Sequence, residues 1–313
     1  MDNIRRILVV HSHHSTRASR YDSVRRELSQ LATWRGWSFS EVVLDSLPYY
    51  EAVKKVLSEL SAGDLVVAAG GDGIAQVSFN AVYFAKAKSD VVFTTIPLGN
   101  GNDICRAFNG RHRAVQTILN QSVMDFYPLN VAADGKIVLS VASYVTFGAT
   151  TVLVDYLNQD GGRRARQLLK SLTPAVAIPV TKLAGISTAI NQLEFPDFHR
   201  DGVTMTDDSI GFFLIPAAHN ILRLPKDITM ASSEFFFHYA TTKDKNLAGK
   251  IIMAGAWTLH FPGQMTELEE LEFIDNTGDI IANVSGDNVN LGPIRHLSAI
   301  RSTRSVKVLF NKH

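Results

Sequence analysis

The residues best suited to chemistry are three glycines and an aspartate that follow an apolar run: Gly70, Gly71, Asp72 and Gly73. Without a Cβ, each glycine lets the backbone turn sharply and approach a bulky ligand. A helical pattern follows, and the first N–H groups of such a helix favour an anion. A carboxylate repels phosphate unless it holds a metal ion or orients a hydroxyl. The turn therefore predicts a nucleotide site that uses Mg²⁺; the alternative is a plain turn in which Asp72 caps the helix.

A second polar loop, Pro97–Asp103, follows another apolar run, Val91–Ile96. Asn102 and Asp103 stand directly before Ile104, where they could cap a further helix. Capping is compatible with ligand binding, because the same helix N-terminus favours an anion.

The loop after the first apolar run carries hydroxyl and imidazole groups. Ser12, Ser15 and Thr16 are candidate donors to a phosphate at a helix N-terminus, with simple solvation of the loop as the alternative. The adjacent His13 and His14 would point apart and have no cysteine or carboxylate close by in the sequence. A metal site is therefore not predicted there.

Strand-like and helical patterns alternate up to about residue 126, which predicts a right-handed, mainly parallel α/β sheet. The expected strands are Ile7–Val10, Trp37–Leu44, Leu65–Ala69 and Val91–Ile96, and the expected helices are Ser23–Ala32, Ala52–Leu60, Ile74–Phe84 and His112–Asn120.

The second half of the chain reads as short strands divided by turn residues, which predicts an antiparallel β domain. We expect an α/β domain over 1–127 and a β-sandwich domain over 128–313, with helical insertions at Arg163–Leu172 and Leu247–Leu259. The expected strands are Lys136–Thr146, Ser209–Ile215, Glu234–Ala240, Leu271–Ile274, Ile280–Val284 and Val306–Phe310.

The composition is typical of a globular protein, and its charges are nearly balanced. Of 313 residues, 46% are apolar and 19% charged, and the net charge of +1 argues against a nucleic-acid partner. The single cysteine, Cys105, fits a reducing compartment. No apolar run is long enough for a membrane span or a signal peptide. We expect a cytoplasmic protein, and a homodimer is left open.

A basic segment with an apolar face offers one route to a membrane surface. Such a helix can dock on anionic lipid at the membrane periphery, although a solvated helix face is the commoner explanation. The basic residues are Arg163, Arg164, Arg166 and Lys170, and the apolar ones are Leu168, Leu169 and Leu172.

The two glycine-bearing motifs, Gly70–Gly73 and then Pro97–Asp103 with Arg106 and Phe108 after it, resemble the diacylglycerol kinase catalytic-domain family. That family includes bacterial diacylglycerol kinases and the sphingosine and ceramide kinases. The resemblance implies an α/β nucleotide-binding domain, a β-sandwich that takes a lipid, and a cleft between them. It also implies transfer of a phosphoryl group from ATP, with Mg²⁺, to the hydroxyl of diacylglycerol or a related lipid.

Carried over residue by residue, the resemblance assigns roles at both loops. Gly70, Gly71, Asp72 and Gly73 would contact the ATP phosphates, with Asp72 reaching Mg²⁺ through the bound nucleotide. The second loop would complete the nucleotide site through Gly99, Asn100, Asn102 and Asp103. Asp287 would take the place of the family's glutamate as the general base for the acceptor hydroxyl. The alternative is that Asp287 simply belongs to a hairpin turn.

Several positions depart from the family pattern and leave two other functions open. One is a degenerate family member that binds nucleotide or lipid as a sensor, and the other is a kinase of a soluble acceptor such as NAD. The departures are Ile74 for a threonine, Gln76 and Val77 for an Asn-Glu pair, Asn100 for a threonine, Ser285 for an aspartate, Ala231–Ser233 for an acidic metal-holding stretch, and His11–Thr16 in place of an Asn-Pro-x-x-Gly loop.

Overall fold

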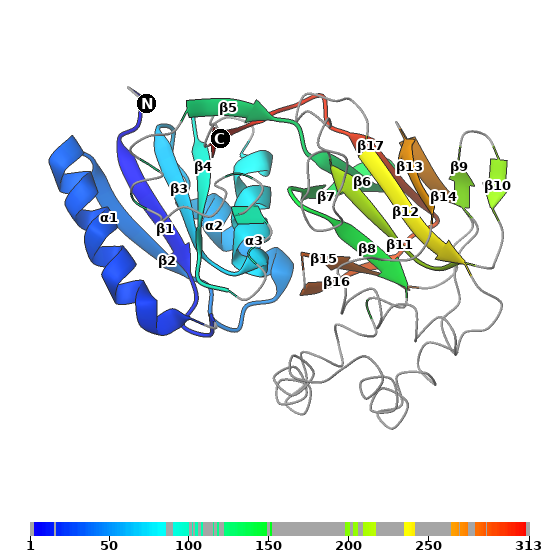
Figure 1. Cartoon of the computed structure of the whole chain (residues 1–313), viewed down its shortest axis with the longest axis horizontal. Helices are drawn as coiled ribbons and strands as arrows, with labels where there is room; N and C mark the ends of the chain where they lie inside the picture. Colours follow the sequence, from blue (N-terminus) through cyan, green and yellow to red (C-terminus); the bar gives the residue numbers. More distant parts are fainter. Residues whose placement is uncertain are drawn as a thin grey trace. The chain divides into compact units, whose positions relative to one another are not determined.

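The computed structural model divides the chain into two compact units, and each is described by itself (Figure 1). The first unit holds Met1–Pro128, Ser140–Ser143 and Ser302–His313, and the second holds Leu129–Leu139 and Tyr144–Arg301. The structure describes residues 3–15, 17–85, 90–99, 122–148, 279–285 and 287–310, the single residues 102, 104, 105, 108, 115, 118 and 151, and strand backbone at 198–200, 203–205, 209–216, 235–241, 264–268 and 270–274.

The first unit is built on one six-stranded sheet of order β2-β1-β3-β4-β18-β5. β1 (Arg6–His11) pairs in parallel with β2 (Ser38–Val43) and with β3 (Asp64–Gly70), and β3 pairs in parallel with β4 (Val92–Pro97). All seven residues of β3 are buried, as expected for a strand covered on both faces. The predicted parallel α/β domain is confirmed.

Helices cover both faces of this sheet (Figure 1). α1 (Tyr21–Arg35) lies on one face, where its buried Leu28 packs with alternate residues of the strands in one apolar cluster. A 3₁₀ turn, Ala18–Arg20, precedes this helix. α2 (Tyr49–Glu59) and α3 (Asp72–Phe84) lie on the opposite face. There Phe79 meets Phe93 of β4 edge to face, with ring centroids 5.4 Å apart.

The C-terminal strand corrects one expectation. The sequence pattern assigned Val306–Phe310 to the second domain, but β18 (Val306–Phe310) lies inside the first sheet. It pairs in parallel with β4 and antiparallel with β5 (Ser122–Phe126). The reason is that β4 needs a hydrogen-bonding partner on its free side, and a strand's own pattern does not reveal which strand supplies one.

The described residues of the second unit form two six-stranded antiparallel sheets, so the expected fold class is confirmed. The first has the order β10-β9-β14-β17-β6-β7 and the second β13-β12-β11-β8-β15-β16. The bounds are β6 Leu129–Ala133, β7 Lys136–Val141, β8 Val145–Gly148, β9 Phe198–Arg200, β10 Val203–Met205, β11 Ser209–Pro216, β12 Phe235–Thr241, β13 Gln264–Leu268, β14 Glu270–Ile274, β15 Asp279–Val284, β16 Asp287–Pro293 and β17 His296–Arg301. The helical insertions predicted at Arg163–Leu172 and Leu247–Leu259, and the stretch Ala231–Ser233, lie outside the described residues.

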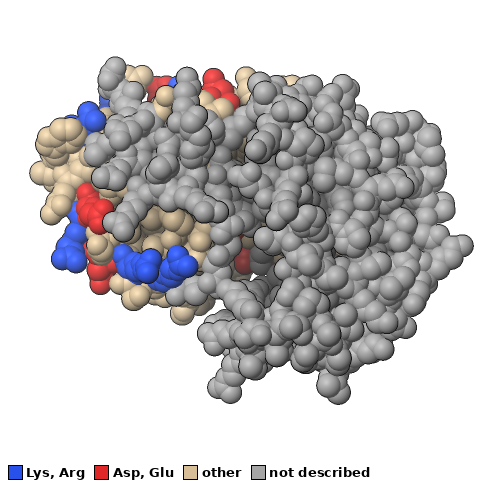
Figure 2. Space-filling view, viewed as in Figure 1, with Lys and Arg blue, Asp and Glu red and all other residues tan. Residues whose placement is uncertain are grey.

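The surface of the first unit carries charges of both signs. On the face shown in Figure 2, the basic and acidic side chains of the described residues lie among one another. This distribution agrees with the net charge of +1. Among the helices that the structure describes, none is both long and apolar enough to cross a membrane.

Two buried amides on α3 hold a backbone segment of the first unit. Gln76 donates to the carbonyl of Ser140 at 2.7 Å and accepts from the N–H of Ala142 at 3.1 Å. Asn80, one turn later, donates to the same carbonyl at 2.8 Å and accepts from the N–H of Ser140 at 2.9 Å. These bonds satisfy backbone groups of Ser140 and Ala142. They also coincide with the point where the predicted run Lys136–Thr146 breaks into two strands.

We predict that Asn80→Ala destabilises the protein by about 2–3 kcal/mol, because it leaves a buried backbone N–H of Ser140 without its acceptor. Urea unfolding measures the loss. Gln30→Ala, on the exposed side of α1, is the control and should change stability by less than about 0.5 kcal/mol. Equal stability of the two variants would contradict the role given to the amide.

Candidate functional site

The predicted nucleotide loops gather at the carboxyl ends of the parallel strands. The loops after β1, β3 and β4 leave the same side of the sheet, because these strands run in parallel. The strand order reverses between β1 and β3, and ligands of open α/β sheets bind at such a reversal. Backbone bonds join the three loops: Arg17 donates to the carbonyl of Leu98 at 3.0 Å, and Leu98 donates to that of Gly70 at 2.8 Å.

Gly71 and Gly99 bring two of these loops into contact. A Cβ built on Gly99 would lie 2.3 Å from the Cα of Gly71, closer than real Cβ atoms come to any atom. A Cβ on Gly70 would lie 2.7 Å from the side chain of Ile74. Only glycine fits at both positions, because the space that a side chain would need is filled by the neighbouring backbone or by Ile74. The close approach of this turn to a ligand remains a prediction.

Asp72 joins the first loop to the start of the next helical segment. It is the first residue of α3, and the N-cap position before it is Gly71, which makes no side-chain cap bond. Its Oδ1 accepts from the N–H of Ile104 at 3.0 Å. Asp72 thus caps a segment 32 residues away.

Asn102 shapes the second loop from within. Its Oδ1 accepts from the N–H of Gly99 at 2.9 Å, and its Nδ2 donates to the carbonyl of Gly99 at 2.7 Å. Its backbone is left-handed, with a φ of 59°, a conformation that asparagine tolerates better than most residues. The side-chain amide of Asn102, a residue that the resemblance assigned to nucleotide binding, therefore stabilises the conformation of the loop.

The loop after β1 is closed by an aspartate that sequence reasoning missed. Ser12 Oγ and the N–H of His13 both donate to Asp45 Oδ1 at 2.8 Å. His13 Nδ1 lies 2.5 Å from Asp45 Oδ2. The hydrogen bond from the His13 side chain, followed by that from Ser12, holds the pKa of Asp45 well below its usual value. Asp45 lies 33 residues from Ser12 in the sequence, and no local pattern connects the two.

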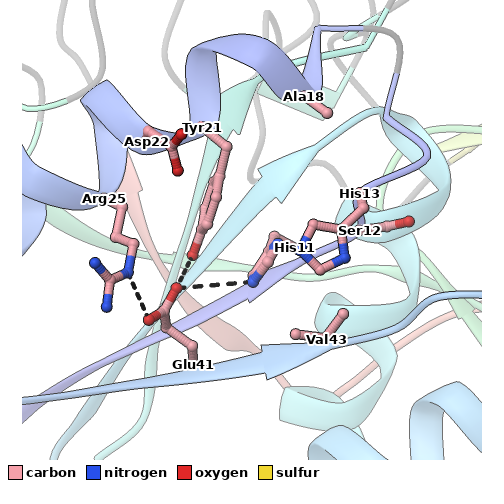
Figure 3. Close-up of a pocket in the computed structure, with 9 residues that line it drawn as sticks. All are labelled: His11, Ser12, His13, Ala18, Tyr21, Asp22, Arg25, Glu41 and Val43. Carbon is pink, nitrogen blue, oxygen red and sulfur yellow. Dashed lines mark hydrogen bonds and ion pairs between the residues drawn. The ribbon is translucent and has the colours of Figure 1, made fainter.

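A cavity of about 420 Å³ adjoins this loop (Figure 3). Glu41 of β2 lies at its base, where it accepts from Tyr21 Oη at 2.5 Å and from Arg25 Nε at 2.8 Å. The cavity is lined by His11, Ser12, His13, Ala18, Tyr21, Asp22, Arg25, Glu41 and Val43. Its polar groups are thus mostly held by one another before any ligand binds.

The imidazole of His11 stacks on the ring of Tyr21, with centroids 3.9 Å apart, and its Nε2 lies 3.7 Å from Glu41. Burial lowers the pKa of His11, although Glu41 opposes this effect. Burial alone would raise the pKa of Glu41, but the bonds from Tyr21 and Arg25 outweigh it and lower that pKa. At neutral pH the site therefore holds a neutral imidazole beside a carboxylate.

The remaining predicted residues are placed as follows. Gly73 lies in the first turn of α3, and Ser15 is bonded through its backbone to Ser12 at 3.2 Å. Asp287 is the first residue of β16 in the second unit, where it is exposed and paired with Val284 of β15 after a hairpin turn; its role as a base remains a prediction. Thr16, Asn100 and Asp103 lie outside the described residues.

No cluster of three or more histidine, cysteine, aspartate or glutamate side chains that could hold a metal occurs among the described residues. A metal ion at Asp72 could take phosphate oxygens of a bound nucleotide as further ligands. That role of Asp72 remains a prediction.

Comparison with known proteins agrees with the motifs. Residues 6–126 match the model of the diacylglycerol kinase catalytic domain, which confirms the resemblance for that part of the chain. A crystal structure of a diacylglycerol kinase from Bacillus anthracis str. Sterne has a TM-score of 0.60 at 11% identity, covering 98% of this chain and 97% of that one. Two structures of proposed diacylglycerol kinases from the same strain have TM-scores of 0.63 and 0.62 at 12% identity, with the same coverage. No curated protein matches the chain.

We predict that Gly99→Ala separates the two glycine loops and weakens binding of an ATP analogue about tenfold or more, because the new Cβ would lie 2.3 Å from Gly71. Calorimetric titration measures the affinity. Gly135→Ala is the control, since a Cβ there meets nothing within 4 Å and costs only backbone strain at a φ of 78°. Unchanged affinity in the Gly99 variant would exclude this loop from the nucleotide site.

Proposed function

We propose that this protein, whose residues 6–126 match the model of the diacylglycerol kinase catalytic domain, phosphorylates the hydroxyl of a lipid such as diacylglycerol with ATP and Mg²⁺. The observation that carries the proposal is the contact between the two glycine loops at the N-terminus of α3. Glycine backbones and free helix N–H groups are the features that receive phosphates in nucleotide-binding proteins.

In the proposed reaction, the protein mainly positions the reactants and balances charge, as in phosphoryl transfer generally. The first N–H groups of α3 and the backbone N–H of Gly71 bind the phosphates of ATP. Gly99, whose own N–H donates to Asn102, lets the second loop lie against the first. Mg²⁺ neutralises part of the phosphate charge when it is bound, and we assign Asp72 to it. Because Asp72 Oδ1 also accepts from Ile104, binding at this carboxylate is tied to the shape of the second loop.

We assign the general base to Asp287 of the second unit. A base needs a carboxylate within hydrogen-bond reach of the acceptor hydroxyl, whose proton it takes as the oxygen attacks the terminal phosphate. Asp287 is exposed at the start of β16 and is therefore accessible to a substrate. The second unit then binds the lipid. The protein reaches a lipid in a membrane by associating with the membrane surface.

A second candidate function is a sensor that binds nucleotide or lipid without turnover. It is favoured by two departures that serve the fold. Ile74, in place of a threonine hydroxyl, occupies the space that a side chain at Gly70 would need. Gln76, in place of an asparagine, holds the backbone of Ser140 and Ala142. Binding of ATP with no transfer to any acceptor would favour the sensor, and transfer to NAD would favour a soluble-acceptor kinase.

We predict that purified protein with radiolabelled ATP and Mg²⁺ labels a lipid from a panel containing diacylglycerol and long-chain bases, and that Asp72→Asn lowers the rate roughly a hundredfold. Asparagine keeps an oxygen that can accept from Ile104, so the loop retains its bond while the charge is lost. Thermal melting checks that the variant is folded. Equal labelling by a folded Asp72→Asn protein would exclude the assigned role.

We predict that Asp287→Asn lowers kcat at least about a hundredfold and leaves the affinity for an ATP analogue unchanged, because the base acts only in the transfer step. Asp279→Asn on the neighbouring strand is the matched control. The Asp279 carboxylate is exposed and accepts from Asn290, a bond that asparagine can keep. A similar loss of kcat in both variants would mean that Asp287 has no special part in the reaction.

A further inference from the structure

The loop after β1 is already folded around an anion that belongs to the chain. The carboxylate of Asp45 accepts from the hydroxyl of Ser12 and from the backbone N–H of His13, both at 2.8 Å. The imidazole of His13 completes the set at 2.5 Å. A hydroxyl, a backbone N–H and an imidazole are the donors that would bind a phosphate at the end of a parallel strand.

The position of this loop makes its occupation consequential. Ser12 and His13 line the cavity at the carboxyl ends of β1 and β2. The far end of the same loop is bonded to the second glycine loop, through Arg17 and Leu98 at 3.0 Å. A nucleotide with its phosphates on the glycine loops therefore has the loop of Ser12 as an immediate neighbour. If the loop of Ser12 offers free donors, it can bind a phosphate of the ligand. If its donors are occupied by the Asp45 carboxylate, it favours an uncharged part of the ligand.

The rest of the described cavity lining adds little positive charge. Arg25 is the arginine of the lining, and its Nε already donates to Glu41 at 2.8 Å. Asp22 and Glu41 add carboxylates to the same wall. Together with Asp45 behind Ser12, these groups make the cavity better suited to an uncharged, hydroxyl-bearing part of a ligand than to a phosphate.

We propose that Asp45 is a specificity-determining residue, an internal anion that occupies the donors of the loop after β1 and excludes phosphate from it. Phosphates then bind only at the glycine loops, and the cavity takes the uncharged sugar and base of a nucleoside. The Ser12 hydroxyl can donate to a phosphate, the role for which it was a candidate from the sequence, only when Asp45 is replaced. The assignment of the ligand as a nucleotide rests on the proposed function; the exclusion of phosphate by Asp45 does not.

The test compares pyrophosphate binding to the full chain and to Asp45→Asn by calorimetry. The variant removes the charge, and the two loops stay joined because Leu44 donates to the carbonyl of His11 at 2.9 Å. We expect pyrophosphate to bind Asp45→Asn roughly five- to tenfold more tightly than the unaltered protein, since a like charge beside the loop is gone. Adding Ser12→Ala should remove most of that gain. Asp45→Ser serves in the same way if the asparagine variant does not fold.

Asp22→Asn is the matched control, because it removes an equal charge from the lining of the adjoining cavity without touching the donors of the loop. Equal pyrophosphate affinity in the unaltered protein and the Asp45 variants would overturn the inference, and so would an equal gain in Asp22→Asn. Failure of the proposed function would give a different result. In that case an ATP analogue would not bind the unaltered protein, whatever the affinity for pyrophosphate.

Discussion

The contact between Gly71 and Gly99 is the constraint on which the rest of the site depends. Parallel strands bring the ends of β3 and β4 side by side, but ordinary side chains would hold the following loops apart. Because neither residue has a Cβ, the backbones touch, and Asp72 and Asn102 can bond across and within the loops. The site is therefore a single backbone structure made of segments distant in the sequence.

Polar side chains at this site serve the fold as much as any ligand. Asn102 bonds to both backbone groups of Gly99, and Asp72 caps a segment far along the chain. Asp45 does the same for the loop after β1. Such internal bonds keep the loops in place without a ligand, so the energy of binding is not used to order them. Divergence of the motifs is compatible with this arrangement, since what the backbone needs is glycine and a few acceptors.

Local patterns in the sequence were sufficient for most elements of the first unit. Apolar runs ending in glycine predicted β3 and the turn to α3, because strand burial and backbone freedom are properties of the residues themselves. The place of β18 could not be predicted in this way, because pairing depends on which strand is left without a partner. For the same reason Asp45 escaped notice, since it reaches the loop through the fold. The break in the run Lys136–Thr146 likewise lies where amides of α3 bond to the backbone, and a local pattern does not reveal such contacts.

The location of β18 also bears on how the protein is made. This strand lies between β4 and β5, yet it is encoded some 180 residues after β5. A ribosome releases the first half of the chain long before the strand that completes its sheet, so β4 and β5 keep open hydrogen-bonding groups while the second half is synthesised. Nascent chains of this protein therefore pass through a long interval of exposure in which a chaperone, or a strand from another chain, can occupy that gap.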